Sequence, residues 1–190
     1  GVINKALLRN RKPYPPRILA EFEWVVGVHD ALHQLKRSGF VLIVFTNQPD
    51  VARGTQSKEQ VEIFHDLIKS ELPVEAIYVC YHDSIDDCSC RKPKPGMILQ
   101  AQQDLNIDLT QSYVIGDRWR DIDAGKAAGC KTIWIDYGYD EQNPFNPDFV
   151  VSNLNDGARI ICDVTEWFWY EQIIHNYCGG GPDRLDFGKS

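Results

Sequence analysis

The sequence is poor in positive charge and has no long apolar run. Its 190 residues include 20 Lys and Arg against 27 Asp and Glu, so the formal net charge is −7. A protein that binds a nucleic-acid duplex through its phosphates usually presents a basic face, so we expect no nucleic-acid partner. No stretch approaches the ~20 apolar residues of a membrane span, and no signal peptide is visible, so we expect no membrane partner. A small anionic substrate remains compatible with this charge, because it needs only a local positive pocket.

The pattern of apolar residues predicts an α/β fold. Hydrophobic residues make up 43% of the chain, which is enough for the core of one domain of this length. Helices are expected at 28–38, 57–71, 97–105, 121–128 and from about 155, and strands at 40–45, 76–79, 113–115, 132–135 and 149–151. This alternation predicts a doubly wound, Rossmann-like parallel sheet, in which ligands bind beyond the carboxyl ends of the strands.

The two ends of the chain are expected to differ from this regular core. We place one domain at residues 1–165 and a C-terminal extension at 166–190. Segment 9–17 holds three prolines and is predicted to be an extended surface loop. The aromatic run 167–170 is expected to be buried, and the tail from Cys178, which lacks periodicity, is expected to be mobile. A monomer is the favoured state.

The most specific motif is a cluster of cysteines and one histidine. Three of the six cysteines crowd with a histidine into eleven residues, as Cys80-x-His82-x5-Cys88-x-Cys90, which favours a metal site over disulfides. Three thiolates and one imidazole are a common structural Zn²⁺ set, and four ligands leave no open position for catalysis. The alternative is a chance cluster of buried thiols. Free thiols elsewhere fit a reducing, cytoplasmic setting, and the loop acids Asp83, Asp86 and Asp87 are expected to be solvated.

Two segments carry groups that suit a phosphate. Thr46, Asn47 and Gln48 follow the strand 40–45, where a hydroxyl and backbone N–H groups can hold a phosphate. The segment 91–94 supplies three cations that prolines stiffen, and a lysine there can neutralise a transferring phosphoryl group. The alternatives are a polar turn after the strand and a solvated basic loop. Arg53 faces either the same crevice or solvent.

A pair of aspartates follows the strand 113–115. Asp117 lies at the end of that strand, and Asp121 comes about one helical turn later. Mg²⁺ prefers carboxylate oxygens together with water and substrate phosphate. Asp117 is therefore predicted to be a direct ligand of Mg²⁺ and Asp121 to support it from outside the first set of ligands. The alternative is that Asp117 merely caps the following helix.

In their order along the chain, these motifs resemble the haloacid dehalogenase superfamily, over about residues 1–161. Within it they resemble the capless, zinc-loop branch, which contains the heptose bisphosphate and histidinol phosphate phosphatases. The matching segments are 44–48, 52–54, the Cys80–Cys90 loop, 91–97 and 116–117. The resemblance implies a magnesium-dependent phosphomonoester hydrolase that acts on a small phosphorylated substrate through an aspartyl-phosphate. A non-catalytic, zinc-stabilised binding module is the alternative from another class.

The resemblance also implies a role for each matching residue. Thr46 and Lys92 would bind the transferring phosphoryl group, and Asp117 would hold Mg²⁺. Asn47 and Gln48 would shape the phosphate pocket, while Arg53, Arg91 and Arg118 would line the substrate side. The segments 52–54 and 94–97 are more like the heptose bisphosphate enzymes. The short loop between the two pairs of zinc ligands is more like the histidinol phosphate enzymes.

One part of the family pattern has no counterpart in the sequence. In the family the first strand ends in Asp-x-Asp, whose first Asp is the nucleophile and whose second is the general acid/base. Here residues 1–4 fit the segment that follows those aspartates, and Asp30, Asp50 and Asp66 lie in the wrong contexts to replace them. That strand is central in the family's sheet, between the strands that precede Thr46 and Asp117. The chain is therefore predicted to give no turnover by itself.

Overall fold

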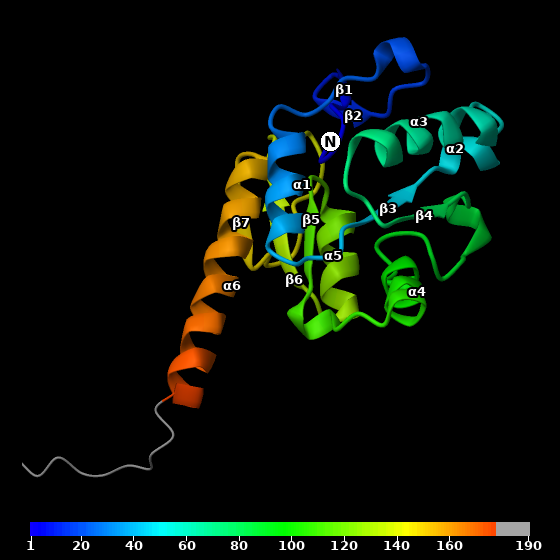
Figure 1. Ribbon diagram of the computed structural model, residues 1–190. Coiled ribbons are helices and arrows are strands. Elements are labelled where there is room, and N and C mark those ends of the chain that lie inside the picture. Colours follow the sequence, from blue (N-terminus) through cyan, green and yellow to red (C-terminus); the bar gives the residue numbers. More distant parts are fainter. Residues whose placement is uncertain (178–190) are drawn as a thin grey trace, which may run out of the picture.

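The computed structural model describes the backbone of residues 1–177 and the side-chain surroundings of residues 1–165 (Figure 1). The predicted tail from Cys178 and the predicted burial of the run 167–170 therefore lie outside the described residues. None of the helices in the described part is both long and apolar enough to cross a membrane.

The chain alternates between strands and helices as predicted. The strands are β1 (Leu7–Arg9), β2 (Lys12–Tyr14), β3 (Ile43–Asn47), β4 (Ala76–Cys80), β5 (Tyr113–Gly116), β6 (Lys131–Ile135) and β7 (Phe149–Val151). The α-helices are α1 (Val28–Arg37), α2 (Pro49–Ala52), α3 (Lys58–Glu71), α4 (Gly96–Leu105), α5 (Trp119–Ala128) and α6 (Leu154–Tyr177), with 3₁₀ turns η1 (Leu19–Glu21), η2 (Ser84–Asp86) and η3 (Leu109–Gln111). The parallel pairs β3–β4, β5–β6 and β6–β7 confirm the α/β class.

Helices cover both faces of the parallel strands. On α5, Gly125 lies so close to Val114 that an added Cβ would be 2.8 Å from it, whereas Gly157 of α6 faces Ile115 and Ile133. Because neighbouring residues of a strand point to opposite faces, α5 and α6 lie on opposite sides. The core on the α6 side also includes Leu32 and Ile68, so α1 and α3 lie there too. Figure 1 shows α1 beside α6. The arrangement is the doubly wound one that the sequence predicts.

The parallel strands form two separate ladders. Among residues 1–177, β3 pairs only with β4, and β5 pairs only with β6. Leu42 accepts a hydrogen bond from the Glu75 N–H, and the Gln48 N–H donates to Cys80. Backbone groups alternate along a strand, so the backbone groups of Ile43, Phe45 and Asn47 point away from β4. This unpaired edge of β3 and the free edge of β5 border the position where the family's central strand is expected.

The start of the first parallel strand lies later than predicted. Gly39 has φ +87°, and the Phe40 N–H donates to the Leu35 carbonyl, so residues 39 and 40 close the end of α1. The strand consequently begins at Ile43 and includes Thr46 and Asn47. Helix α3 begins where the sequence predicts, and the Ser57 side chain caps it by accepting a hydrogen bond from the Gln60 N–H.

The prediction of an irregular loop at 9–17 is wrong for its first half. β1 and β2 pair as an antiparallel hairpin, joined by Asn10 and Arg11 with φ of 52° and 61°. Two successive left-handed residues make the tight turn whose twist matches that of the flanking strands. The tip packs on a distant loop, since Arg11 donates to the Gly138 carbonyl at 3.0 Å and accepts from the Asp140 N–H at 3.0 Å.

Candidate functional site

Lys92 links the edge of β3 to helix α5, which follows β5. Its ammonium donates to the Phe45 carbonyl at 2.9 Å, on the unpaired edge of β3, and forms an ion pair with Asp121 at 2.6 Å. The side chains of Lys92 and Asp121 are only 12% and 11% exposed, so this pair is well shielded from water. The predicted phosphate lysine and the predicted metal-supporting aspartate are therefore brought together at the carboxyl ends of β3 and β5.

Asn47 fixes the backbone of Lys92. Its side-chain carbonyl accepts from the Lys92 N–H at 3.1 Å, and its amide group donates to the Lys92 carbonyl at 3.2 Å. Gln48 donates from its side chain to the Thr46 hydroxyl at 3.3 Å. Of the predicted group Thr46, Asn47 and Gln48, Asn47 contacts Lys92 directly, through the backbone of the lysine, whereas Gln48 contacts Thr46.

Asp117 is buried with one oxygen free of hydrogen bonds. Its residue is 7% exposed, and Oδ2 has no hydrogen-bond partner among the described residues. The α-ammonium of Gly1 lies 3.1 Å from that oxygen. Burial raises the pKa of Asp117, but the Gly1 ammonium and then Lys92 outweigh it and hold the pKa below its ordinary value. Oδ2 is therefore ion-paired with Gly1, and a buried, ionised carboxylate of this kind suits a hard divalent cation such as Mg²⁺.

Asp121, rather than Asp117, caps helix α5. Asp121 Oδ2 accepts from the backbone N–H of Arg118, the N-cap residue, at 3.1 Å, while Oδ1 binds Lys92. The helix-capping alternative for Asp117 is therefore not supported. Gly116 makes this packing possible, because a Cβ there would lie 2.2 Å from the Asp121 Cβ.

The Cys/His loop has the geometry of a tetrahedral zinc site. The candidate ligand atoms of Cys80, His82, Cys88 and Cys90 all lie within 4.8 Å of one another. Sγ of Cys88 is 3.7 Å from Sγ of Cys80 and 3.4 Å from Sγ of Cys90. These separations exceed a disulfide bond of about 2.05 Å and approach the ~3.8 Å between two thiolates bound to one zinc ion. The four donors therefore suit a Zn²⁺ ion and would leave none of its coordination positions open.

The raised pKa values of two cysteine thiols oppose the deprotonation that metal binding requires. Burial, followed by hydrogen bonds with Cys80 and Cys88, raises the pKa of Cys90 to about 12. Burial also raises the pKa of the Cys80 thiol. Metal ligands must be deprotonated, so Zn²⁺ would release protons as it binds, and its affinity would rise with pH.

The three arginines assigned to the substrate side do not converge on one point. Arg118 forms a two-pronged pair with Glu141, whose Nε–Oε2 distance is 2.8 Å. Burial opposes the charge of Arg118, but Glu141 outweighs it and raises the pKa of the guanidinium. Arg91 donates to the His82 carbonyl at 3.0 Å, and Arg53 binds Asp83. Each guanidinium thus already has a protein partner.

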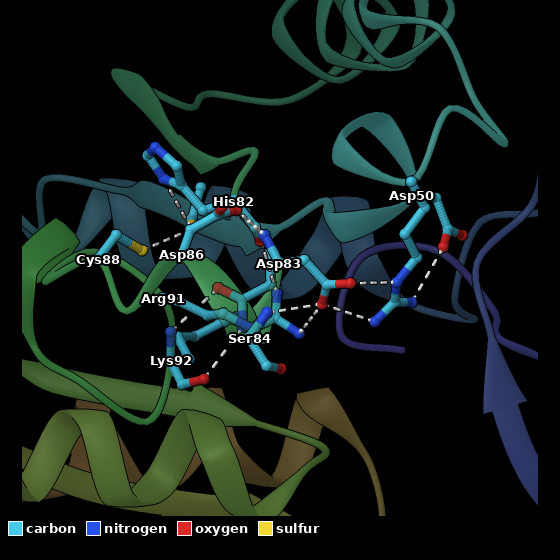
Figure 2. Close-up of polar contacts among 11 residues, drawn as sticks. Asp50, His82, Asp83, Ser84, Asp86, Cys88, Arg91 and Lys92 are labelled. Carbon is cyan, nitrogen blue, oxygen red and sulfur yellow. Dashed lines mark hydrogen bonds and ion pairs between the residues drawn. The ribbon is translucent and has the colours of Figure 1, made fainter.

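Asp83 of the zinc loop is bonded rather than merely solvated, which corrects one prediction, whereas Asp86 and Asp87 are exposed to solvent as expected. Figure 2 shows Asp83 between Asp50 and Arg91, with its carboxylate inside a group of polar contacts. The Arg53 guanidinium, followed by the Ser84 N–H, lowers the pKa of Asp83 to about 2. Asp87 pairs with Lys94 at 2.5 Å but stays 90% exposed.

A small hollow of about 10 Å³ lies beside Asp117 and was not foreseen from the sequence. Its other walls are largely aromatic or acidic, and include Trp119, Trp134, Tyr137, Tyr139 and Glu141. Tyr137, Tyr139 and Glu141 follow β6, but no spacing among them marks a site. The only signal in the sequence was that these three residues follow a predicted strand, whose carboxyl end is where ligands are expected to bind.

Comparison with known proteins identifies relatives of this arrangement. The profile of the HAD-hydrolase-like family, where HAD stands for haloacid dehalogenase, matches residues 89–157. The D-glycero-beta-D-manno-heptose-1,7-bisphosphate 7-phosphatase of Pasteurella multocida is 35% identical over 155 residues, which cover 74% of this chain and 84% of that protein. The protein of the same name from Haemophilus influenzae is 40% identical over 121 residues, which cover 58% of this chain and 66% of that protein.

A solved structure agrees with the sequence relatives. The crystal structure of D,D-heptose 1,7-bisphosphate phosphatase from B. bronchiseptica, complexed with magnesium and phosphate, superposes with a TM-score of 0.69 at 25% identity. The match covers 86% of this chain and 94% of that one. Several of the similar curated proteins are matched over only about two thirds of their own length.

Proposed function

Because this chain belongs to the haloacid dehalogenase-like hydrolases, we propose that it forms most of a phosphatase acting on a small sugar phosphate. The observation that carries this proposal is the meeting of Lys92 with Asp121, one helical turn from the buried Asp117. In this proposal Lys92 would face the phosphoryl group, and the Asp117 carboxylate would face the metal ion.

Asp117 is the residue we propose to hold Mg²⁺, with Asp121 supporting the site. When bound, the ion would offset charge on the phosphoryl oxygens. Lys92 would neutralise the same group from the other side, with the Thr46 hydroxyl as a hydrogen-bond donor. The Asp121–Lys92 ion pair and the Phe45 carbonyl hold the ammonium at a defined position, and its one remaining N–H stays available to the ligand.

We propose that the nucleophile enters on a strand between β3 and β5. The two ladders are not bonded to each other, and the Gly1 ammonium already lies beside Asp117. Asp50, which follows β3, is paired with Arg53, and Asp30 and Asp66 lie within α1 and α3. None of these three aspartates supplies a free carboxylate at this position.

The first candidate substrate is D-glycero-D-manno-heptose 1,7-bisphosphate, after the names of the relatives. Histidinol phosphate is second, favoured by the short loop between the zinc ligand pairs. The proposal includes Zn²⁺ as a structural ion in the Cys80–Cys90 loop, and the free thiols support a reducing, cytoplasmic setting.

The substrate assignment is tested with a chain to which an Asp-x-Asp strand has been added before Gly1. We expect its kcat/KM to be at least about tenfold higher for the heptose bisphosphate than for histidinol phosphate or an aryl phosphate, as for a site that recognises groups beyond the phosphate. A preference for histidinol phosphate selects the second candidate. Equal rates on all three contradict both assignments.

Asp117→Asn is expected to abolish Mg²⁺ binding without unfolding the chain. The amide keeps the shape of the side chain but removes the charge, so affinity should fall by more than the roughly tenfold that loss of an outer partner costs. Calorimetric titration with Mg²⁺ measures the effect. Asp123→Asn, on the helix that follows Asp117, is the matched control, since Asp123 contacts the Phe145 N–H. Equal Mg²⁺ affinity in both variants would remove Asp117 from the metal site.

A further inference from the structure

The zinc loop places one carboxylate between two of the arginines assigned to the substrate side. Asp83 Oδ2 accepts from Arg53 Nε at 2.7 Å, and Oδ1 accepts from Arg53 Nη2 at 2.7 Å. Arg91 Nη2 lies 3.7 Å from Oδ1 of the same carboxylate. Asp83 is thus bound through both oxygens by one guanidinium and approached by a second (Figure 2).

In this arrangement each of the three guanidinium nitrogens of Arg53 already contacts a carboxylate. Its Nε and Nη2 bind Asp83, and its Nη1 contacts Asp50 at 3.3 Å. The side-on fork of a guanidinium is the geometry that also binds phosphate. Two arginines and two aspartates sum to zero formal charge, so the group offers no net attraction while Asp83 stays in place.

The position of Asp83 is set by the metal loop. Asp83 follows the zinc ligand His82, its N–H donates to Asp86 Oδ2 at 2.7 Å, and its Oδ1 accepts from the Ser84 N–H at 2.7 Å. Arg91 follows the ligand Cys90 and is held on the His82 carbonyl. Arg53 comes from α2, which follows β3, while the zinc loop follows β4. The group therefore lies at the same carboxyl edge as Lys92, where substrates of such sheets bind.

We propose that Asp83 is a specificity-determining residue, whose carboxylate occupies the place of a second anionic group of the substrate. A sugar monophosphate leaves the Asp83–Arg53 pair intact. A sugar bisphosphate meets Arg53 and Arg91 only by displacing Asp83. The inference rests on the proposed function, because it assumes that the first phosphate binds at Lys92.

The test compares a sugar bisphosphate with its monophosphate on the zinc-loaded chain. Fructose 1,6-bisphosphate and fructose 6-phosphate are titrated calorimetrically with Mg²⁺ present. Asp83→Asn should raise affinity for the bisphosphate about tenfold, as expected when a charge-assisted fork becomes free. The affinity for the monophosphate should stay within about twofold, since exposed charges act weakly over a distance. One zinc ion per chain in every variant shows that the loop is intact.

Asp87→Asn is the matched control, with the same change on the same loop at a side chain that contacts only Lys94. It should alter neither affinity. Adding Arg53→Gln to Asp83→Asn should abolish the gain. If the monophosphate binds but Asp83→Asn leaves the bisphosphate unchanged, weaker, or no better than Asp87→Asn, the assignment of Asp83 is overturned and the phosphate site stands. If neither ligand binds any variant, the proposed function is overturned as well.

Discussion

The purified 190-residue chain is expected to release no phosphate from a phosphomonoester, even with Mg²⁺ and Zn²⁺ present. Covalent phosphoryl transfer needs a carboxylate aimed at the phosphorus, and the carboxylates beside Lys92 have other roles. Asp121 is bound at both oxygens, and Asp117 is assigned to the metal. Loss of the nucleophile lowers kcat by up to about a millionfold in enzymes where the whole set acts together. A continuous phosphate-release assay at saturating substrate measures this directly.

Activity should return when a strand with the family's pattern is fused before Gly1. An apolar strand that ends in Asp-x-Asp would pair with the free edges of β3 and β5 and place its first aspartate near Lys92 and Asp117. The matched control is the same fusion with Asn in place of the first aspartate, which restores the sheet but not the nucleophile. Magnesium-dependent turnover by the unfused chain contradicts the assignment. A well-folded fusion without turnover would support the non-catalytic zinc-stabilised module.

The second large effect is expected at the zinc loop. Cys88→Ser removes one of four ligands and should reduce bound zinc from one ion per chain to none. Loss of a structural metal costs about 4 kcal/mol or more, which for a domain of this size lowers Tm by about 10 °C. Metal analysis and a thermal melt measure both quantities. Zinc affinity of the unchanged chain should also fall as pH is lowered, because protons compete for the Cys80 and Cys90 thiols, whose pKa values are raised.

Cys130→Ser is the control for the zinc prediction. Cys130 is also a buried free thiol, but it lies in the core beside α5 and outside the cluster. This variant should keep its zinc and lose only the stability of an ordinary buried substitution, about 1–2 kcal/mol. Full zinc occupancy in Cys88→Ser would show that the cluster is not the metal site.

The parts of the fold that depend on local chemistry could be predicted from the sequence. The order of strands and helices and the spacing of the zinc ligands each involve neighbours in the chain. The hairpin at Leu7–Tyr14 was missed, because the three prolines suggested irregular structure and the Asn10–Arg11 turn lacks the glycine that usually marks it. The start of β3 was misplaced, because apolar residues that end a helix look the same as those that begin a strand.

Contacts between distant segments were beyond such reasoning. The residue types at Arg53, Arg118 and Asp83 suggested solvent or substrate, but each guanidinium binds a carboxylate far away in sequence. Arg118 pairs with Glu141 and Arg53 with Asp83. The pairing of each arginine with its carboxylate depends on how loops from different strands fold over the edge of the sheet. A local sequence pattern does not determine that arrangement.

The two hydrogen bonds between Asn47 and Lys92 bear on the thermodynamics of ligand capture. A lysine on a free loop loses backbone and side-chain freedom when it closes on a phosphate, and that loss weakens binding. Here the backbone of Lys92 is held at both polar groups, and its ammonium already rests on Phe45 and Asp121. Most of the ordering has occurred during folding. A phosphate that binds at this site loses bound water and gains a contact with an ammonium group whose position is already fixed. Most of the entropy lost on binding is therefore lost by the ligand rather than by the protein.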